Sequence, residues 1–574
     1  MSIFEIYINK IKELIKKKQK NLELKNLNDF KNVTVEVPPS NFDSDLSCNV
    51  SLILGKINKK NPKELAEKIK KIIYENLNDF ENIEIAGPGF LNFKLSKASL
   101  IANINGIIKN RETYGRKNSN KTYNIEFVSA NPTGPMHVGH CRGAIFGDVL
   151  ANLLKFNGNK VTKEYYINDY GNQIYNFVKS VFLRIREIKY DEEFINNEDL
   201  YPGEYIILIG KKIIDENKNE KFDNFKKSFE LLKKYSLKYS MELIKTDLKN
   251  LGIKHDIFFS ESLLIKNKLV DKAVSHLRDK KFVVDGYLKP PKGETDSNWK
   301  KQKRLIFKST LFGDDTDRAL QKNDSSWTYF ANDIGYHMDK VNRKYDYLIN
   351  VLGADHTGYI KRITAAVSAI SDNKTNLDCK VCQLVKLFKN GKPFKMSKRA
   401  GEFISAKDLL DEVDKDAIRF IMLNRSNDVE LDFDFDKILE KNKENPVFYV
   451  QYSFARINSL FRNLNKKLDY DISLNIKNFN LNDIEAKILR KVLEWPKIVE
   501  VSSTKLEPHR ITYYLYELAT LFHSYWSMGN EDFNLKFIEN GKIKREEILA
   551  IVSTVAIVVK RGMNILGVSL PEQM

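Results

Sequence analysis

Two histidines stand in a proline- and glycine-rich segment, SANPTGPMHVGHCRG, at residues 129–143. The run TYNIEFV, which reads as a strand, precedes this segment and a long helical pattern follows it, so we expect a tight turn that joins a strand to a helix. In such a turn His137, His140 and the backbone N–H groups of the first helical turn can face one anion. Gly139 lets a flat ring approach the backbone. The chemistry indicated is nucleotide binding, while a metal-binding pair and a structural pair remain alternatives for the histidines alone.

A second segment that could bind phosphate stands far downstream, NGKPFKMSKRAG, at residues 390–401. Lys395 and Lys398 lie on a loop bounded by Gly391 and Gly401, which can act as hinges. A mobile loop with two point charges can close on a triphosphate while negative charge builds on a departing pyrophosphate. A lysine-rich loop without a specific role is the alternative, and the histidine turn makes it the weaker one.

The two motifs HVGH and KMSK together resemble those of class I aminoacyl-tRNA synthetases, and the surrounding sequence is similar to the arginyl-tRNA synthetase family. The likeness is carried by EFVSANPTGPMHVGH, DRALQKNDSSWTYFANDIGYHMDK, LGADHTGYIKR, KMSKRAG and ENPVFYVQYSFARI, and it extends to the last residues, ILGVSLPEQM. It therefore covers essentially the whole chain. For ATP binding the resemblance implies His137, Gly139, His140, Lys395, Met396, Ser397 and Lys398, and among these it implies His137, His140, Lys395 and Lys398 for catalysis.

The resemblance also implies a two-step reaction. L-Arginine and ATP give arginyl-adenylate and pyrophosphate, and the arginine then passes to the 3′-terminal ribose of tRNA(Arg), which releases AMP. The arginine carboxylate is already ionised, so no protein nucleophile is needed and the protein supplies alignment and charge stabilisation. Mg²⁺ is expected to enter with ATP, held by phosphates and water rather than by a ligand motif. As in the family, tRNA is expected to be needed for activation.

Arginine as the substrate agrees with the charge of the expected pocket. A guanidinium carries five N–H donors and a permanent charge, so a selective pocket needs carboxylates. The resemblance places Glu126, Ser129, Asn131, Tyr329, Asp333 and His356 in that pocket. Asp333 can alternatively cap the helix that follows it, and Tyr329 can alternatively belong to the core.

The elements that must position these residues can be read from local patterns. Ser2 and Glu5 form a capping box that opens a helix, and Asn61 opens another. The run IEIAGPGFLNFKL predicts a hairpin that turns at residues 87–89. The run TYNIEFV predicts a strand, and AIFGDVLANLLKFNG a helix that ends near Gly158; DYLINVLGAD and YIKRITAAVSAI predict a second strand and helix of the same kind.

The predicted fold class is α/β, a Rossmann-like parallel-sheet catalytic domain between an N-terminal α+β domain and a C-terminal all-α helical bundle. The predicted domains are residues 1–118, which contact tRNA; 119–385, catalytic, with an insertion at about 191–303; 386–440, the KMSK loop and connecting region; and 441–574, which bind the anticodon. In the last domain we expect helices behind Asn482 and Pro508, and a final helix that ends near Gly562.

Composition limits the class of protein, its compartment and its partners. The chain has 574 residues and a net charge of +18, which suits a polyanionic partner such as nucleic acid. The four cysteines are too few for a secreted disulfide framework, so we expect a cytoplasmic protein. The longest apolar run, at residues 548–559, is too short to cross a bilayer, and we expect no membrane partner. A strand is predicted across Cys379 and Cys382, with a buried structural role for both rather than zinc binding. A monomer is implied by the family likeness.

Two other functions remain open at this point. One is a synthetase-like ligase that transfers an activated amino acid to a small amine, for which the N-terminal unit and the long helical tail would be unnecessary. The other is a basic RNA-binding protein without catalysis, which leaves both phosphate motifs unexplained. Pyrophosphate exchange separates the three, because a ligase exchanges without tRNA, a binding protein does not exchange, and an arginyl-tRNA synthetase exchanges when tRNA is present.

Overall fold

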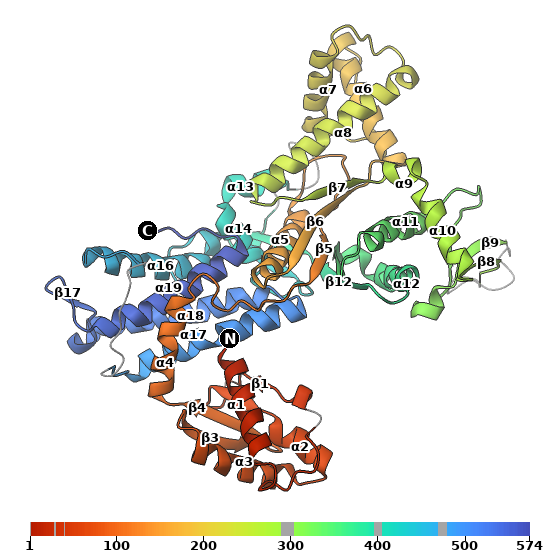
Figure 1. Cartoon of the computed structure of the whole chain (residues 1–574). Coiled ribbons are helices and arrows are strands. Elements are labelled where there is room, and N and C mark those ends of the chain that lie inside the picture. The colour runs from red at the N-terminus through yellow and green to blue at the C-terminus, as the bar shows by residue number, and fades with distance from the viewer. Residues whose placement is uncertain (1, 28–29, 40, 289–302, 395–403, 469–478) are drawn as a thin grey trace. The chain divides into compact units, whose positions relative to one another are not determined.

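The protein divides into two compact units. The computed structural model describes residues 2–27, 30–39, 41–288, 303–394, 404–468 and 479–574 (Figure 1). One unit joins Met1–Asn118 to Glu440–Met574, and the other comprises Ser119–Leu439. The two ends of the chain therefore share a unit, and the histidine turn lies in the other.

The N-terminal part of the first unit is an α+β layer. Its antiparallel sheet has the strand order β1-β2-β4-β3, formed by Val35–Glu36, Leu46–Cys48, Phe90–Leu95 and Phe80–Ala86 in that order. The helices of this part are α1 (Ile3–Lys17), α2 (Val50–Asn58), α3 (Pro62–Asn76) and α4 (Lys97–Lys109). The predicted capping box of Ser2 and Glu5 opens α1, and the Asn61 side chain caps α3. The predicted hairpin is also confirmed, since β3 pairs with β4 across residues 87–89.

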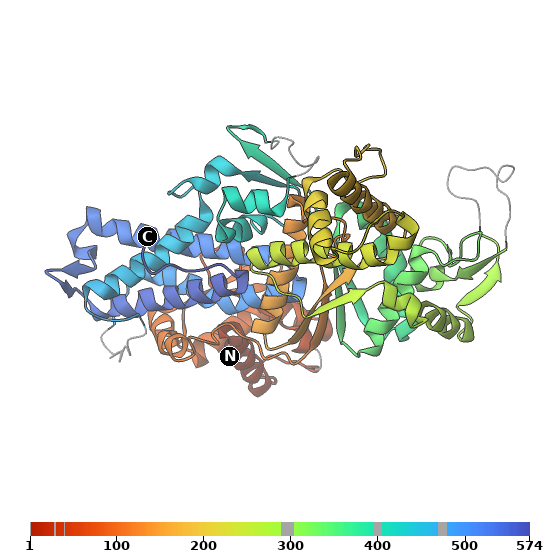
Figure 2. The same ribbon diagram turned by 90° about the horizontal axis from the view of Figure 1, so that it is seen from above.

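The C-terminal part of the first unit is a helical bundle. Figure 2 shows its long helices running side by side: α16 (Pro446–Asn463), α17 (Asp483–Lys505), α18 (His509–Glu531) and α19 (Glu546–Leu566). Asn482 and Pro508 stand at the starts of α17 and α18, as predicted. The predicted end of the last helix near Gly562 is wrong, because α19 continues to Leu566 and ends at Gly567, which has a φ of 67°. Gly562 is instead a packing position, where an added Cβ would lie 2.7 Å from the Leu515 side chain.

Helix α19 is longer than its apolar run suggested. Among the described residues it is the one helix long and apolar enough to cross a membrane, with a mean hydropathy of 1.7 over 18 residues. Our expectation that this run is too short therefore underestimated the helix, which extends beyond residues 548–559 on both sides. Of that window, 78% is buried within the protein, as in the core helix of a bundle.

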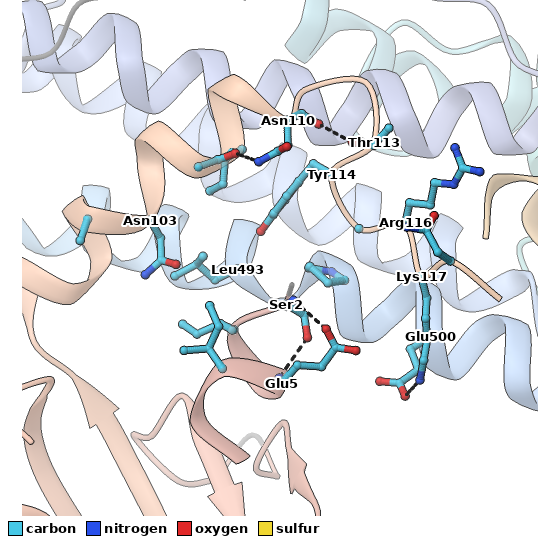
Figure 3. A pocket seen from close by; sticks show the side chains of 18 residues that line it. Ser2, Glu5, Asn103, Asn110, Thr113, Tyr114, Arg116, Lys117, Leu493 and Glu500 are labelled. Carbon is cyan, nitrogen blue, oxygen red and sulfur yellow. Dashed lines mark hydrogen bonds and ion pairs between the residues drawn. The ribbon is translucent and has the colours of Figure 1, made fainter. Parts of the chain in front are cut away.

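A polar cavity of about 540 Å³ lies between α1, α4, the loop at 110–118 and α17 (Figure 3). The loop is held in place by Tyr114, whose hydroxyl donates to the Val492 carbonyl at 3.1 Å and whose carbonyl accepts from Trp495 Nε1 at 3.0 Å. Gly115 follows with a φ of +90°, and an added Cβ there would lie 2.5 Å from Trp495. The cations Arg116 and Lys117 at the mouth of the cavity therefore stand on a fixed loop.

The second unit is built on a parallel sheet with the strand order β12-β11-β5-β6-β7. The strands in that order are Asn376–Cys382, Tyr347–Gly353, Thr122–Glu126, Lys160–Ile167 and Ile257–Ser260. Helix α5 (Val138–Phe156) follows β5 and packs against the sheet, and α12 (Ile360–Ser371) follows β11. Both predicted strand and helix pairs are thus present, and β5 and β11 are neighbours in the sheet. The predicted Rossmann-like sheet is confirmed.

Strand β7 lies inside the interval 191–303, which we expected to leave the sheet. It pairs in parallel with β6, from Glu164 opposite Ile257 to Ile167 opposite Ser260. This strand has only four residues, all partly buried, so the sequence offers no periodicity by which to find it. Residues 191–303 therefore do not form one continuous insertion, because β7 returns to the sheet within them.

Two groups of elements flank the sheet. Figure 1 shows α6 (Asn172–Tyr190), α7 (Glu204–Glu216) and α8 (Phe225–Asn250) standing together over an apolar cluster of their own. The second group shares another apolar cluster and consists of α9 (Ser262–Lys266), α10 (Leu269–Asp279), α11 (Tyr329–Asn342), α12 and the strands β8 (Val283–Gly286) and β9 (Arg304–Phe307). Strand β10 (Arg318–Ala319) pairs with β9.

A small sheet completes the second unit. It has the order β14-β13-β15, with Lys392–Pro393, Val385–Lys389 and Leu431–Asp434. The helices near it are α13 (Ala406–Glu412), α14 (Lys415–Met422) and α15 (Phe435–Leu439). In the first unit, β16 (Ile538–Glu539) and β17 (Lys542–Ile543) form a two-stranded antiparallel sheet.

Candidate active site

The chain turns sharply where β5 ends. Val128 and Ser129 have φ values of 71° and 42°, in the left-handed region that a β-branched residue such as valine rarely adopts. The turn is held by the neighbouring strand, since the Tyr166 N–H donates to Ser129 Oγ at 3.1 Å and the Tyr165 hydroxyl donates to the Ala130 carbonyl at 2.7 Å. Backbone strain therefore concentrates at the predicted turn, where the surrounding sheet sustains it.

The two histidines of the turn form the start of α5. His137 is the N-cap, and its Nδ1 accepts from the Gly139 N–H at 3.1 Å. His140 Nδ1 accepts from the His137 N–H at 3.3 Å, and the two rings stack with their centroids 3.6 Å apart. Because both Nδ1 atoms accept, each neutral ring carries its proton on Nε2. This tautomer makes each imidazole a hydrogen-bond donor at Nε2.

Both rings are neutral at physiological pH. Burial lowers the pKa of His137, and burial together with the neighbouring His137 lowers the pKa of His140 to about 3. The pair can therefore donate hydrogen bonds to a phosphate, but it brings no full positive charge.

The segment that follows the KMSK motif pairs with the histidine turn. The Val138 N–H donates to the Ile404 carbonyl at 2.9 Å, and the Ala406 N–H donates to the Met136 carbonyl at 2.8 Å. His137 and Ser405 form an antiparallel bridge between these two hydrogen bonds. The motif residues Lys395, Met396, Ser397 and Lys398 lie outside the described residues, but the chain that follows them is joined to the backbone of the turn.

A cavity of about 390 Å³ opens beside the turn. Six of the residues expected to bind substrates line it: Glu126, Ser129, Asn131, His140, Asp333 and His356. Tyr329 does not line the cavity; its side chain at the start of α11 is 70% exposed, and the Lys322 ammonium lies 5.4 Å from its ring centre. His356 stands at the cavity wall, with Nε2 3.4 Å from the Asp355 carboxylate.

Asp333 is the most perturbed carboxyl group of the cavity. Burial, with the nearby charges of Glu126 and Glu261, raises its pKa to about 7, while a hydrogen bond donated by the Tyr359 hydroxyl acts in the opposite direction. Helix capping is not its role, because α11 begins earlier and the Thr328 side chain is its cap.

Glu261 is a second carboxylate in this neighbourhood that sequence reasoning missed. It is only 4% exposed, its Oε1 accepts from Asn332 Nδ2 at 3.1 Å, and burial raises its pKa. It directly follows β7, whose place in the sheet could not be read from the sequence, so no local signal identifies it. Two carboxylates with raised pKa values thus lie near each other, an arrangement that favours a cationic ligand.

Glu126 is already partly neutralised. Its Oε2 accepts from the ammonium of the fully buried Lys340 at 2.5 Å, and its Oε1 accepts from Ser129 Oγ at 3.1 Å. Asp333, Tyr336, His337 and Lys340 recur at the helical spacing on α11, and all except Lys340 line the cavity. That spacing is the signal by which Tyr336, His337 and Lys340 could have been found.

The CxxC pair lies on β12, as predicted. Both cysteines are free thiols, with Cys382 buried and Cys379 partly buried, and burial raises the pKa of each to about 12. Both therefore stay protonated at neutral pH.

Three family models match the chain. They are the arginyl-tRNA synthetase N-terminal domain at residues 8–95, the class I (R) tRNA synthetase catalytic domain at residues 103–464, and the DALR anticodon-binding domain at residues 450–574.

Known proteins are similar to this chain in sequence and in structure over nearly its whole length. An arginine–tRNA ligase of Pelagibacter ubique is 53% identical over 577 residues and covers 100% of both chains. One of Ruegeria pomeroyi is 44% identical over 555 residues and covers 95% of each chain. In structure, the arginyl-tRNA synthetase of Thermus thermophilus has the same fold, with a TM-score of 0.71, 18% identity and 100% coverage of both chains. From the motifs, the fold and these matches along its whole length, the chain belongs to the arginyl-tRNA synthetase family of class I aminoacyl-tRNA synthetases.

Proposed function

We propose that this enzyme is an arginine–tRNA ligase that activates L-arginine with ATP, forms arginyl-adenylate and pyrophosphate, and then charges the 3′-terminal ribose of tRNA(Arg), releasing AMP. The observation that carries the proposal is a cavity with an acidic end beside the HVGH turn, in a chain that matches arginine–tRNA ligases over 95% to 100% of their length. Adenylate formation requires the amino acid and the nucleotide to lie side by side. The cavity meets this requirement, because His140 of the HVGH turn lines it together with Glu126 and Asp333.

We propose that the acidic end of the cavity binds the guanidinium group of arginine. Asp333 and Glu261 supply two carboxylates near each other, which suits the five N–H donors of a guanidinium. Glu126, Ser129 and Asn131 stand at the end of β5, and we propose that they hold the α-amino and carboxylate groups of the arginine. His356 completes the wall, and Tyr329 would have to turn inward to take part.

We propose that the HVGH turn and the KMSK segment bind ATP. We propose that Nε2–H groups of His137 and His140 donate to phosphate oxygens, with Gly139 giving the nucleotide room. Because both rings are neutral, we propose that Lys395 and Lys398 supply positive charge opposite the departing pyrophosphate, with Met396 and Ser397 in the same loop.

Mg²⁺ is proposed to enter with ATP. Within the part of the chain that the structure describes, no group of three His, Cys, Asp or Glu side chains could hold a metal ion. Phosphate oxygens and water are the ligands that Mg²⁺ prefers in nucleotide sites. It would neutralise phosphate charge there, while the residues of this chain orient the nucleotide.

Binding of tRNA is proposed at both ends of the chain. The helical segment that matches the anticodon-binding model is proposed to contact the anticodon, and the N-terminal part the outer corner of the tRNA. Within the first unit, Arg116 at the mouth of the polar cavity (Figure 3) is an exposed cation on a fixed loop, which suits a phosphate of the RNA backbone. We further propose a cytoplasmic monomer and a tRNA requirement for activation.

The test is aminoacylation of total tRNA with a panel of amino acids, repeated with Lys398→Ala and Asp333→Ala. Arginine should be charged preferentially, Lys398→Ala should slow the chemistry, and Asp333→Ala should damage arginine recognition. Pyrophosphate exchange is measured with and without tRNA. Rapid exchange without tRNA would reject the proposed tRNA requirement, and preference for another amino acid would reject arginine as the substrate.

A further inference from the structure

Asp247 touches no part of the substrate cavity, yet it is bonded to the backbone of the histidine turn. It lies on α8, is 6% exposed, and its Oδ2 accepts from the Met136 N–H at 3.0 Å. Met136 directly precedes His137 and is itself fully buried. A buried backbone N–H without an acceptor is strongly unfavourable, so the bond fixes where this part of the turn lies.

The other edge of the same short stretch carries the segment that follows KMSK. The Met136 carbonyl accepts from the Ala406 N–H, and the Val138 N–H donates to the Ile404 carbonyl. Residues 136–138 are thus held on one side by Asp247 and on the other by residues 404–406. A shift of the stretch would move the His137 ring and the far anchor of the KMSK segment together.

We propose that Asp247 is a positioning residue for adenylate formation, which holds residues 136–138, hydrogen bonded to residues 404–406, so that the histidine pair is aligned for the nucleotide. The inference rests on the proposed function. It goes beyond that function because it assigns a role in the ATP half of the site to a side chain on α8, a helix that supplies no residue to the cavity.

The charge of Asp247 adds to this bond. A carboxylate acceptor makes a charge-assisted hydrogen bond, which is stronger than a neutral one. Three titratable groups act on it or respond to it: Asp408 and Lys407 on α13, and the Cys141 thiol on α5. Burial in the first place, and then Asp408, raises the pKa of Asp247 to about 6, while the Met136 N–H and Lys407 act in the opposite direction. The bond should therefore weaken as the pH falls through about 6.

Two variants and one matched control test the role. Asp247→Ala removes the acceptor, and Asp247→Asn keeps the shape and one acceptor oxygen but removes the charge. Asp256→Asn is the control, because Asp256 Oδ2 also accepts a backbone N–H, that of Lys163 at 2.9 Å, but lies outside the turn. Pyrophosphate exchange with tRNA is measured per active site from pH 5.5 to 8, with ATP varied at saturating arginine and then arginine varied at saturating ATP.

Asp247→Ala is expected to lower kcat by about tenfold to hundredfold, because a small displacement of aligning groups can cost about 100-fold in rate. KM should rise for ATP and stay within about twofold for arginine, because the change acts through the histidine turn. Asp247→Asn should retain most of the activity at pH 8 and lose the fall in kcat near pH 6. Asp256→Asn should match the native enzyme in kcat and in both KM values.

Other results would overturn the role. If Asp247→Ala keeps the native kcat per active site, or raises both KM values equally, Asp247 only stabilises the fold. If Asp247→Asn keeps the native acid limb, its carboxylate does not set that limb. Failure of the proposed function is a separate result, because the native enzyme would then not charge arginine at all.

Discussion

The Asp333→Asn substitution is the sharpest test of the arginine site. It keeps the shape of the side chain and removes the charge at the end of the cavity. Asp333 is only partly buried, and Glu261 remains nearby as a second carboxylate. The loss should therefore approach that of one charged hydrogen bond rather than that of a whole buried ion pair.

The expected fall in kcat/KM follows from the loss of one charged hydrogen bond. A hydrogen bond to a charged group contributes about 2–3 kcal/mol, which corresponds to a fall of about 30-fold to 150-fold in kcat/KM for arginine. The change should appear mainly in KM for arginine, because the guanidinium lies away from the reacting carboxylate. KM for ATP should stay at its native value.

The pH dependence gives an independent check. The raised pKa of Asp333, about 7, belongs to the protein without arginine. Only the deprotonated carboxyl carries the charge that attracts a guanidinium, so kcat/KM for arginine should rise with pH up to about 7 and then level off. In Asp333→Asn this limb should be absent.

The assay is steady-state charging of tRNA across pH 5.5 to 8.5, with arginine varied at saturating ATP. Asp339→Asn is the matched control, because Asp339 lies on the same helix but pairs with Arg343 at 3.1 Å, outside the cavity lining. The reasoning is refuted if Asp333→Asn leaves KM for arginine within about twofold of native, or if Asp339→Asn raises it as much.

Three further changes test other parts of the structure. His140→Ala should lower kcat by about 100-fold, on the scale of an oxyanion-hole donor, and a native kcat limb near pH 6.5 that this variant abolishes would contradict a ring whose pKa is lowered to about 3. Lys340→Met leaves Glu126 without its buried cation and should lower the free energy of unfolding by about 3–5 kcal/mol; an unchanged urea midpoint would contradict the buried pair. Arg116→Ala should raise KM for tRNA and reduce its dependence on log salt concentration by about one unit, with KM for ATP and arginine unchanged; an unaltered salt slope would exclude a phosphate contact.

Local sequence patterns were enough for the elements that local physics decides. Ser2, Asn61 and Asn482 each cap a helix where they were expected, because a cap needs only the side chain and the next few N–H groups. The strand, turn and helix around the histidines were equally visible, since the glycines and prolines mark the turn and the helix has its own periodicity.

Long-range contacts decided what the sequence could not give. Strand β7 is too short to show a period, and its place in the sheet depends on pairing with β6, which is distant in sequence. Glu261 follows that strand and was missed with it. Gly562 looked like a helix end because glycine is common there, but its missing side chain lets the Leu515 side chain approach. Lys340 differs, because its helical spacing from Asp333 was readable and only its partner Glu126 was not.

The neutral histidine pair and the lysines of the KMSK loop are suited to different roles in catalysis. A donor that is already neutral costs little to bury and keeps its direction through the capping bonds at Nδ1, so His137 and His140 are suited to alignment. Charge stabilisation then depends on groups that can stay in water until the nucleotide is bound, which is the property of a loop lysine. Because residues 404–406 are hydrogen bonded to residues 136–138, the backbone that follows that loop is paired with the backbone from which the aligning rings start. Substitutions that move this backbone should therefore affect both alignment and charge stabilisation, whereas Lys398→Ala should affect the second alone.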